Sequence, residues 1–424
     1  MLKRIRFFLI LLSILILLAV PVIAQQSNYV TLPLTGAILD TENKLEIFDY
    51  EINMGGLGYQ VIDNGTVFFE SPDPADAIQH ALDNGATVFM TSGVYHKVSN
   101  GVVYVHDNNV LVGAGESTVL DSIQINVAAH SCTLRNFTVT GSPTGGVAWQ
   151  NSAIFIYGDA SDVYVEDIKA FDLSSLVHGA FYIYVEDQII SNVTFKGCKA
   201  IDCGSHGFLN LGNGDSTSII RTLNYIDCEA INCGKTKRYN DWVAGYVFNE
   251  MLTIEDVLIE GCYAEGNWES GFHFEVNYPK TNVVLRNCES VENGVKPNCS
   301  YGAGFLISSG CSIEYCKSSN NYKGIMLVNS LPSPAFINHC EDRGSYRNLH
   351  ISGTAGQVEV ANWKGYNSVE SSIRINSAAN IRFREEVYAI NPGVNPLDFG
   401  ASTNCSGNLI IEDATGTYTI SLPP

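Results

Sequence analysis

Glu269, His273 and Glu275 lie in one short stretch, WESGFHFEVN, and their side chains are of types that transfer protons. The stretch alternates apolar and polar residues, which predicts a β-strand with Phe272 and Phe274 pointing inward. His273 and Glu275 then point outward, and Glu269 precedes them in a turn. Two carboxylates at a suitable separation suit glycoside hydrolysis, whereas a base beside a cation suits removal of a proton next to a carboxylate.

A basic segment precedes this strand in an otherwise acidic chain. GKTKRYNDWVA carries Lys237 and Arg238 beside Tyr239 and Asp241. We expect these four side chains to share one patch with the three acid–base residues, where they would neutralise a negative charge or move a proton. The alternative is a solvated loop, since most charge runs are solvated.

The chain repeats itself, and the repeats determine how these side chains are positioned. Eight segments align at intervals of 24 to 34 residues, from CTLRNFTVTG at residue 132 to AFINHCEDRG at residue 335. Each is followed by a turn and a second short strand around a glycine, as in HGFLNL, SGFHFE and KGIMLV. A unit of this size without a helix cannot bury its own apolar face, so the units must stack and pair their strands in parallel. The pattern predicts an all-β solenoid of about ten to twelve coils.

Half of the twelve cysteines share one column of the repeat, which other repeats fill with Phe137 and Ile168. We interpret this column as an inward packing position filled by free thiols, because disulfides between parallel side chains about 4.8 Å apart would be strained. A column of thiols does not supply tetrahedral ligands, so no metal site is expected there. The six are Cys198, Cys228, Cys262, Cys288, Cys316 and Cys340.

The remaining cysteines have other environments. Cys203 and Cys233 occupy a second column that becomes asparagine in later repeats, which predicts a buried ladder of small or polar side chains. Cys299 and Cys405 are expected in loops, exposed or bridged.

A helix is predicted over residues 74–84 by SPDPADAIQHALDNG, with Asp73 as N-cap, Pro74 in the first turn and Gly85 after its end. Such a helix would cover the open end of the solenoid. With this cap, TVFMTSGVYH, NNVLVGAG and the stacked glycine strands, the chain resembles the pectin-lyase-like family of right-handed parallel β-helices, from about residue 60 to residue 420. The resemblance implies the fold, which hosts lyases, hydrolases, epimerases, phage spikes and adhesins.

In that family, substrate grooves usually run along the outside of the strand that carries the repeated glycine. His178 and His206 stand just before this glycine in adjacent coils, and Trp242, Trp268 and Tyr301 stand three residues before it in successive coils. An aromatic file at coil spacing suits stacking against sugar rings. We therefore expect the three rings and His178 to hold a glycan, and His206 to be a further acid or base. The alternative is that the rings only cover a turn.

The resemblance does not extend to one activity. SHGFLNLGN is similar to a strand of the polygalacturonases, but their paired aspartates are missing, and His273-Phe274-Glu275 replaces an Arg-Ile-Lys strand. The Arg-x-Pro-x-x-Arg segment of pectate lyases is also missing. The sequence therefore does not discriminate between a lyase and a hydrolase. No cofactor is indicated, and no spacing points to a Ca²⁺ site, although clustered carboxylates could form one.

The termini and the composition bear on location and partners. Residues 1–24 are expected to be a cleaved signal peptide, with an uncleaved anchor as the alternative, followed by an N-terminal extension over 25–60 and the β-helix over 61–424. No later stretch approaches the length of a membrane span. The net charge of −20 disfavours nucleic acid as a partner. N-x-S/T triplets predict surface positions at Asn64, Asn136, Asn192, Asn298 and Asn404.

We expect a secreted or cell-surface carbohydrate-active protein, either a polysaccharide lyase or a glycoside hydrolase that acts on an extracellular glycan. The rival hypothesis is a non-catalytic β-helix that binds a surface glycan or has a structural role. The sequence does not indicate an oligomeric state.

Overall fold

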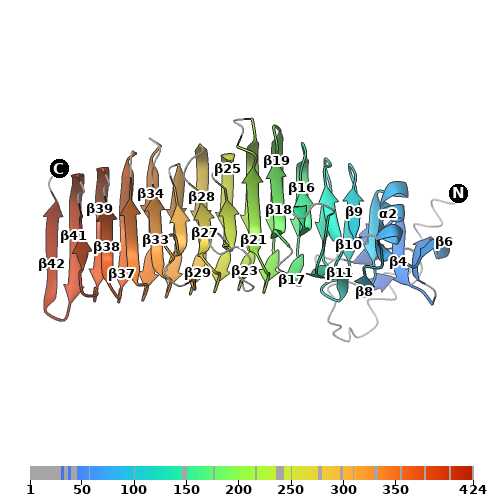
Figure 1. The fold of residues 1–424 in the computed structure, drawn as a ribbon, viewed down its shortest axis with the longest axis horizontal. Helices are drawn as coiled ribbons and strands as arrows, with labels where there is room; N and C mark the ends of the chain where they lie inside the picture. Colours follow the sequence, from blue (N-terminus) through green and yellow to red (C-terminus); the bar gives the residue numbers. More distant parts are fainter. Residues whose placement is uncertain are drawn as a thin grey trace.

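A computed structural model describes the chain over residues 30–32, 37–39, 45–56, 58–99, 101–145, 150–174, 177–214, 217–234, 243–249, 251–275, 279–296, 299–308, 310–328, 333–353, 356–376, 379–400 and 403–422. Strands make up 61% of it, and the fold is a parallel β-solenoid of about 11 turns. The predicted right-handed β-helix is confirmed. Figure 1 shows the coils stacked along one axis, from helix α2 at one end to strands β41 and β42 at the other. The expected signal peptide lies outside the described residues.

One face of every coil belongs to a 12-stranded parallel sheet, which carries the glycine strands. Its strands are β9 (Val102–Val105), β12 (Gln124–Val127), β15 (Ser152–Ile156), β18 (Gly179–Val185), β21 (His206–Gly212), β24 (Tyr246–Phe248), β27 (Ser270–Phe274), β30 (Ala303–Ile307), β33 (Lys323–Val328), β36 (Arg347–Ser352), β38 (Ser371–Asn376) and β40 (Leu397–Asp398).

The other faces belong to a 27-stranded sheet that bends at each coil. Before the bend run β7 (Thr87–Met90), β10 (Val110–Gly113), β13 (Thr133–Arg135), β16 (Ser161–Glu166), β19 (Ile189–Lys196), β22 (Ile219–Ile226), β25 (Thr253–Glu260), β28 (Lys280–Arg286), β31 (Cys311–Glu314) and β34 (Ala335–Asn338). After it run β8 (Gly93–His96), β11 (Thr118–Asp121), β14 (Thr138–Gly141), β17 (Lys169–Leu173), β20 (Lys199–Ile201), β23 (Glu229–Ile231), β26 (Tyr263–Glu265), β29 (Glu289–Val291), β32 (Lys317–Ser319) and β35 (Glu341–Arg343). The longer strands β37 (Val358–Tyr366), β39 (Ala379–Ile390) and β41 (Thr403–Asp413) continue both files.

Antiparallel strands occur only near the two ends of the described chain. β4 (Tyr50–Met54), β5 (Tyr59–Asp63) and β6 (Thr66–Ser71) form a meander whose β4 pairs with β7, and β1 (Val30–Leu32), β2 (Ala37–Leu39) and β3 (Leu45–Ile47) form a small separate sheet. At the other end, β42 (Gly416–Leu422) pairs with β41.

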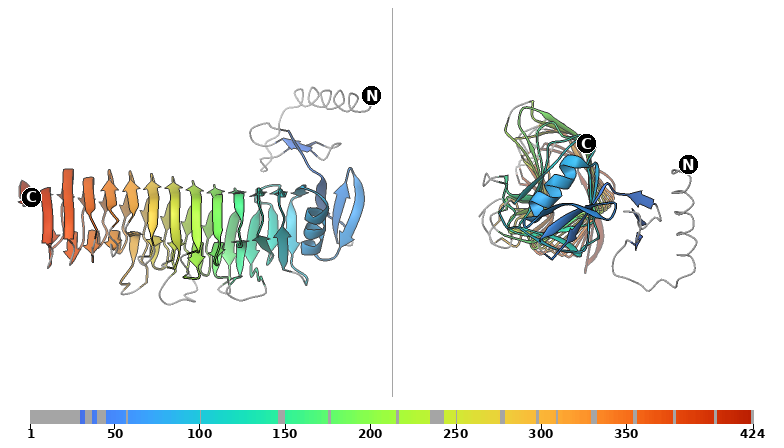
Figure 2. Two further views of the ribbon diagram at one scale, coloured as in Figure 1. Left: turned by 90° about the horizontal axis from the view of Figure 1, so that it is seen from above. Right: turned by 90° about the vertical axis from the view of Figure 1, so that its right-hand side faces the viewer.

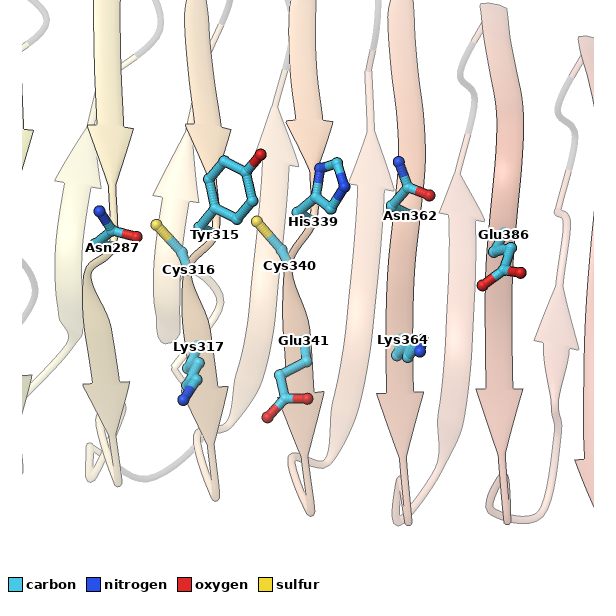
Figure 3. Close-up of a pocket in the computed structure, with 10 residues that line it drawn as sticks. All are labelled: Asn287, Tyr315, Cys316, Lys317, His339, Cys340, Glu341, Asn362, Lys364 and Glu386. Atoms are coloured by element: carbon cyan, nitrogen blue, oxygen red, sulfur yellow. The ribbon is translucent and has the colours of Figure 1, made fainter.

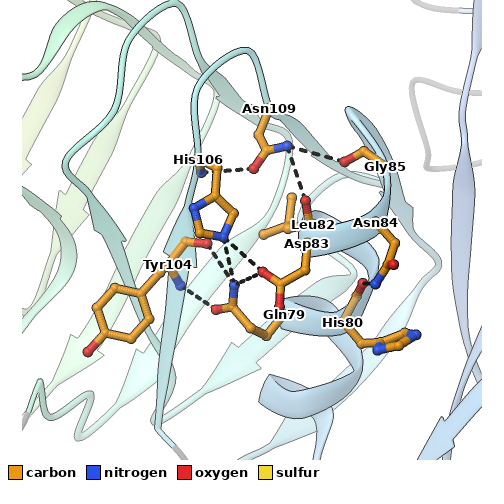
Figure 4. Close-up of polar contacts among 9 residues, drawn as sticks. All are labelled: Gln79, His80, Leu82, Asp83, Asn84, Gly85, Tyr104, His106 and Asn109. Atoms are coloured by element: carbon orange, nitrogen blue, oxygen red, sulfur yellow. Dashed lines mark hydrogen bonds and ion pairs between the residues drawn. The ribbon is translucent and has the colours of Figure 1, made fainter.

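Helix α2 (Pro74–Asn84) lies across the N-terminal end of the coils (Figure 2). The Asp73 side chain accepts a hydrogen bond from the Ala75 N–H at 3.1 Å and so caps the helix. Polar side chains then join the helix to the first coil (Figure 4): His106 Nε2 lies 2.8 Å from Asp83 Oδ1, and Gln79 hydrogen-bonds both backbone groups of Tyr104. The helix thereby covers an end that would otherwise expose core. No helix in the described part of the chain is long and apolar enough to cross a membrane.

The interior contains a continuous stack of parallel aromatic rings. Neighbouring centroids are 4.6 to 4.9 Å apart and the planes differ by less than 10°. This is an offset-stacked arrangement repeated at strand spacing, so the rings reinforce the coil register as well as filling volume. The predicted inward direction of Phe272 is confirmed, and the stack comprises Phe181, Phe208, Tyr246, Phe272 and Phe305.

The cysteine column is buried, as expected, with exposures of 0 to 2%. Each thiol lies 3.3 to 3.5 Å from the carbonyl oxygen of a buried apolar residue in the preceding coil; Cys262, for example, donates to Tyr225 and Cys288 to Ile259. All six are free thiols. The column therefore combines apolar packing with a weak, repeated hydrogen bond.

The second column is the expected buried ladder. The Cys203 and Cys233 thiols donate to the carbonyls of Ala170 and Ala200, and asparagine amides take over this role in later coils. The amides of Asn267, Asn293 and Asn321 donate at 2.9 Å, and their oxygens accept backbone N–H groups of the preceding coil.

Two surface expectations are wrong. Cys299 is 1% exposed rather than exposed or bridged, because its thiol packs against Glu269; Cys405 lies in β41, half-buried and free. Asn136 is only 6% exposed, at a corner of a coil where it adopts the left-handed conformation (φ 62°). Asn64 and Asn192 are exposed as predicted.

Candidate acid–base site

Strand β27 positions the central residue of the candidate site, His273, on the outer face of the 12-stranded sheet. Its neighbours Phe272 and Phe274 are buried in the core, so alternation turns the imidazole outward as predicted. His273 Nε2 lies 3.0 Å from Glu275 Oε1, and Nδ1 lies 3.8 Å from Glu269 Oε2. The imidazole is therefore flanked by two carboxylates.

Exposure differs sharply among the three residues. The side chains of His273 and Glu269 are each 2% exposed, whereas that of Glu275 is 15% exposed. Glu275 is therefore the member of the group that an external molecule can reach most directly. The other two stand behind it.

Burial and charge set the protonation of this group. Burial alone would lower the pKa of His273, but the hydrogen bond and charge of Glu275 outweigh it and leave that pKa raised. Burial raises the pKa of Glu269 against the charge of His273. The raised pKa keeps His273 protonated to higher pH, so that its N–H can donate to Glu275.

His206 and His178 lie beside this group on neighbouring coils, with ring centroids 6.3 Å apart. Burial, with smaller contributions from the charges of His178 and His273, lowers the pKa of His206 to about 3, so its ring is neutral near pH 7. Its Nδ1 accepts the Ala244 N–H at 3.3 Å. The two histidines do not occupy one column, however. The register pairs His206 with Gly179, the residue after His178.

Two further groups near Glu269 did not emerge from the sequence. The Cys299 thiol lies 3.4 Å from Glu269 Oε1, and the Lys323 ammonium, within electrostatic reach of Glu269, donates to the Ser300 carbonyl. Burial, assisted by the charge of Arg347, lowers the pKa of Lys323 to about 8. The signal for Lys323 was its place just before Gly324 in KGIMLV, the position that holds histidine in earlier coils.

The aromatic residues near the site extend beyond the predicted file. Trp268 is half-buried and Tyr301 is exposed, both beside the turn that carries Glu269. In the next two coils, Tyr322 and Tyr346 stack with centroids 5.5 Å apart and planes 3° apart. Sequence reasoning missed this pair because it stands two, not three, residues before the glycine position.

Five predicted residues lie outside the described part of the chain: Lys237, Arg238, Tyr239, Asp241 and Trp242. Their expected convergence with Glu275 therefore stays a prediction. Within the described residues, no group of three His, Cys, Asp or Glu side chains could hold a metal ion.

The arrangement can move protons. Glu275 can accept or deliver a proton at the surface, and the protonated His273 can hydrogen-bond to it. Glu269 and the neutral His206 lie deeper and influence the protonation of His273. Lys323 adds a positive charge that can be partly neutralised near pH 8. The fold and this group together define a right-handed parallel β-helix with a buried acid–base cluster.

Comparisons with known proteins add three structures of limited similarity. No family model matches the chain, and no curated protein matches it either. The A-module of the Azotobacter vinelandii mannuronan C-5 epimerase AlgE4 is 15% identical (78% of this chain and 96% of that one, TM-score 0.47). The catalytic domain of a GH87 alpha-1,3-glucanase with nigerose is 13% identical (84% and 71%, TM-score 0.45), and an N-terminal fragment of bacteriophage Phi29 gene product 12 is 15% identical (83% and 71%, TM-score 0.48). At these identities and TM-scores, none of the three bears on the chemistry of this chain.

Proposed function

We propose that this protein is an exported polysaccharide-degrading enzyme whose acid–base centre is Glu275, His273 and Glu269. One observation carries the proposal: a buried histidine on the outer face of the sheet lies between two carboxylates, and only one of these reaches toward solvent. Buried charges of this kind are costly, and clusters with perturbed pKa values concentrate at functional sites.

The position of His273 favours elimination over two-carboxylate hydrolysis. Hydrolysis by a pair of carboxylates requires both to face the scissile bond. Here the imidazole stands between them, so Glu275 alone would face a substrate. In an elimination, Glu275 would take the proton from the carbon next to a uronate carboxylate. The electron pair of that C–H bond would form a C=C bond. The C–O bond to the leaving sugar would break, and its electron pair would stay on the oxygen. A second group must protonate that oxygen, and the candidate is Tyr239, because the low pKa of His206 leaves it without an acidic proton near pH 7.

The other expected residues fit around this step. Lys237, Arg238 and Lys323 would neutralise the uronate carboxylate, and Trp242, Trp268, Tyr301 and His178 would hold the sugar chain. The proposal of export rests on the expected signal peptide over residues 1–24, which would direct the protein outside the cell or to its surface.

The test is turnover of a polysaccharide panel by the mature chain: polygalacturonate, alginate, hyaluronan, chondroitin sulfate, laminarin and dextran. Ultraviolet absorbance reports unsaturated ends and a reducing-end assay reports any cleavage. We expect unsaturated ends from a uronate polymer, and their loss in Glu275→Gln and His273→Ala but not in the surface control Glu412→Gln. Reducing ends without ultraviolet absorbance would indicate a hydrolase. No cleavage of any polymer would contradict the proposal and favour the non-catalytic β-helix.

A further inference from the structure

A second feature lies on a different part of the solenoid, at the bend of the 27-stranded sheet. One residue at each bend adopts the left-handed conformation, with φ of 50–65° from Asn136 to Asn362. Most coils use Asn, Asp or Gly there, because a side chain without local hydrogen bonding costs about 1–2 kcal/mol in this conformation. Two adjacent coils use Tyr315 (φ 56°) and His339 (φ 53°) instead.

These two rings do not serve the core. Tyr315 is 51% exposed and His339 is also exposed. They stack on each other with centroids 4.7 Å apart and planes 18° apart. An aromatic pair is worth about 0.5–1.5 kcal/mol, which does not clearly repay the cost of two left-handed bends. Outliers of this kind are a reason to look for a function.

The pair borders a groove of about 610 Å³. Figure 3 shows two rows of side chains along neighbouring coils: Tyr315, His339 and Asn362 form one, and Lys317, Glu341 and Lys364 form the other. The second row alternates in charge, because the register pairs Lys317 with Glu341 and Glu341 with Lys364. Glu386 lies at one end of the groove. Arg343 forms an ion pair with Glu341 at 3.2 Å.

We propose that this groove binds a neutral glycan chain that runs along the solenoid axis. A ring stacked on an exposed tyrosine, beside a row of donors and acceptors for hydroxyl groups, is the arrangement that a sugar unit requires. The mixed charges provide hydrogen bonds without the local positive field that would favour a polyanion. The groove is lined by residues of β32, β35, β37 and β39 and by the bends that precede β32 and β35. His273 lies on β27 in the other sheet, so the two sites are separate.

The decisive variant replaces both rings with the residue that this bend usually carries, Tyr315→Asn/His339→Asn. Affinity electrophoresis of the mature chain would use gels that contain laminarin, dextran, hydroxyethyl cellulose, polygalacturonate or alginate. We expect one of the neutral polymers to retard the wild-type chain, and the double variant to bind it at least about tenfold more weakly, or about 1.4 kcal/mol. The control Tyr418→Asn removes another exposed tyrosine, from β42, and should bind normally.

Stability separates binding from packing. If the rings serve a ligand, the asparagine variant relieves strain and its thermal midpoint stays the same or rises. A lower midpoint would show that the rings stabilise the fold, and would overturn the proposal. Retardation by none of the five polymers, or only by the acidic ones, would also overturn it. Glu275→Gln should still bind, so that loss of turnover and loss of binding are distinguishable.

Discussion

His273 Nε2 lies 3.0 Å from Glu275 Oε1, in a pair whose histidine is buried and whose carboxylate reaches toward solvent. His273 lies in strand β27, and Glu275 is the first residue after the strand ends. The two residues are two positions apart, so their side chains point to the same face of the sheet. The contact raises the pKa of the buried His273 and links that residue to the acidic group of the cluster that a substrate would meet.

The first prediction concerns pH. The pKa of His273 is raised in the folded protein, so its pairing stabilises the fold fully below the unfolded value of about 6.5 and this contribution is lost as pH rises through the raised pKa. This contribution to the free energy of unfolding should therefore fall as pH rises from about 6.5 through the raised pKa of His273. In Glu275→Gln the fall should be shallower, because the partner charge is gone. Urea unfolding at several pH values measures this, and identical slopes in the two proteins would contradict it.

The second prediction concerns Lys323. Its folded pKa of about 8 is below the usual value near 10.5, so at pH 7 the fold bears the cost of a buried ammonium. Stability should rise as pH rises between these two values, because the unfolded chain then holds the extra proton. Lys323→Met should raise the free energy of unfolding at pH 7 by about 1–3 kcal/mol, after the loss of the hydrogen bond to Ser300.

The control for that variant is Lys317→Met, which removes an exposed lysine and should leave stability nearly unchanged. A Lys323→Met protein that is less stable than wild type would contradict the prediction and show that the hydrogen bond from the ammonium to Ser300 stabilises the fold. If Lys323 also acts on substrate, the stabilised variant should lose turnover, as expected where stability and activity conflict.

The third prediction concerns the thiols. All twelve cysteines are free, and every one except Cys405 is buried. Alkylation of the folded protein should modify at most Cys405, and alkylation after denaturation should modify all twelve with or without prior reduction. Intact mass measures both. Any increase in labelling caused by reduction would reveal a disulfide and contradict the free ladder.

The fourth prediction concerns the asparagine ladder. Asn293 Oδ1 accepts from both the backbone N–H and the side-chain amide of Asn267, so Asn293→Ala leaves buried donors unpaired. We expect a loss of about 2–4 kcal/mol by chemical denaturation. Asn293→Cys should cost less, because Cys203 and Cys233 fill the same column, and the exposed Asn408→Ala should have little effect. Equal losses for Ala and Cys would show that the ladder's hydrogen bonds do not matter.

Much of the fold could be predicted from the sequence, because the coils repeat at regular intervals and the residues of each strand alternate between apolar and polar. Strand alternation placed Phe272 and Phe274 inside, and the repeated cysteine and asparagine positions identified two interior columns. In a solenoid each coil contacts mainly its neighbours, so a column read from the aligned repeats is a column in space. The same reasoning placed His273 and Glu275 on one outward face.

The composition of the site was decided by the tertiary structure. Turns differ in length between coils, so a residue offset by one or two positions, such as Lys323 or Tyr322, reaches the same region as Glu269. Cys299 was expected at the surface, yet it is buried against that carboxylate of the preceding coil. Burial then sets the chemistry: it leaves His206 neutral and lowers the pKa of Lys323, and neither effect is encoded in residue type or spacing. Sequence alone determines which side chains face outward, and packing determines which of them meet and which proton each one holds.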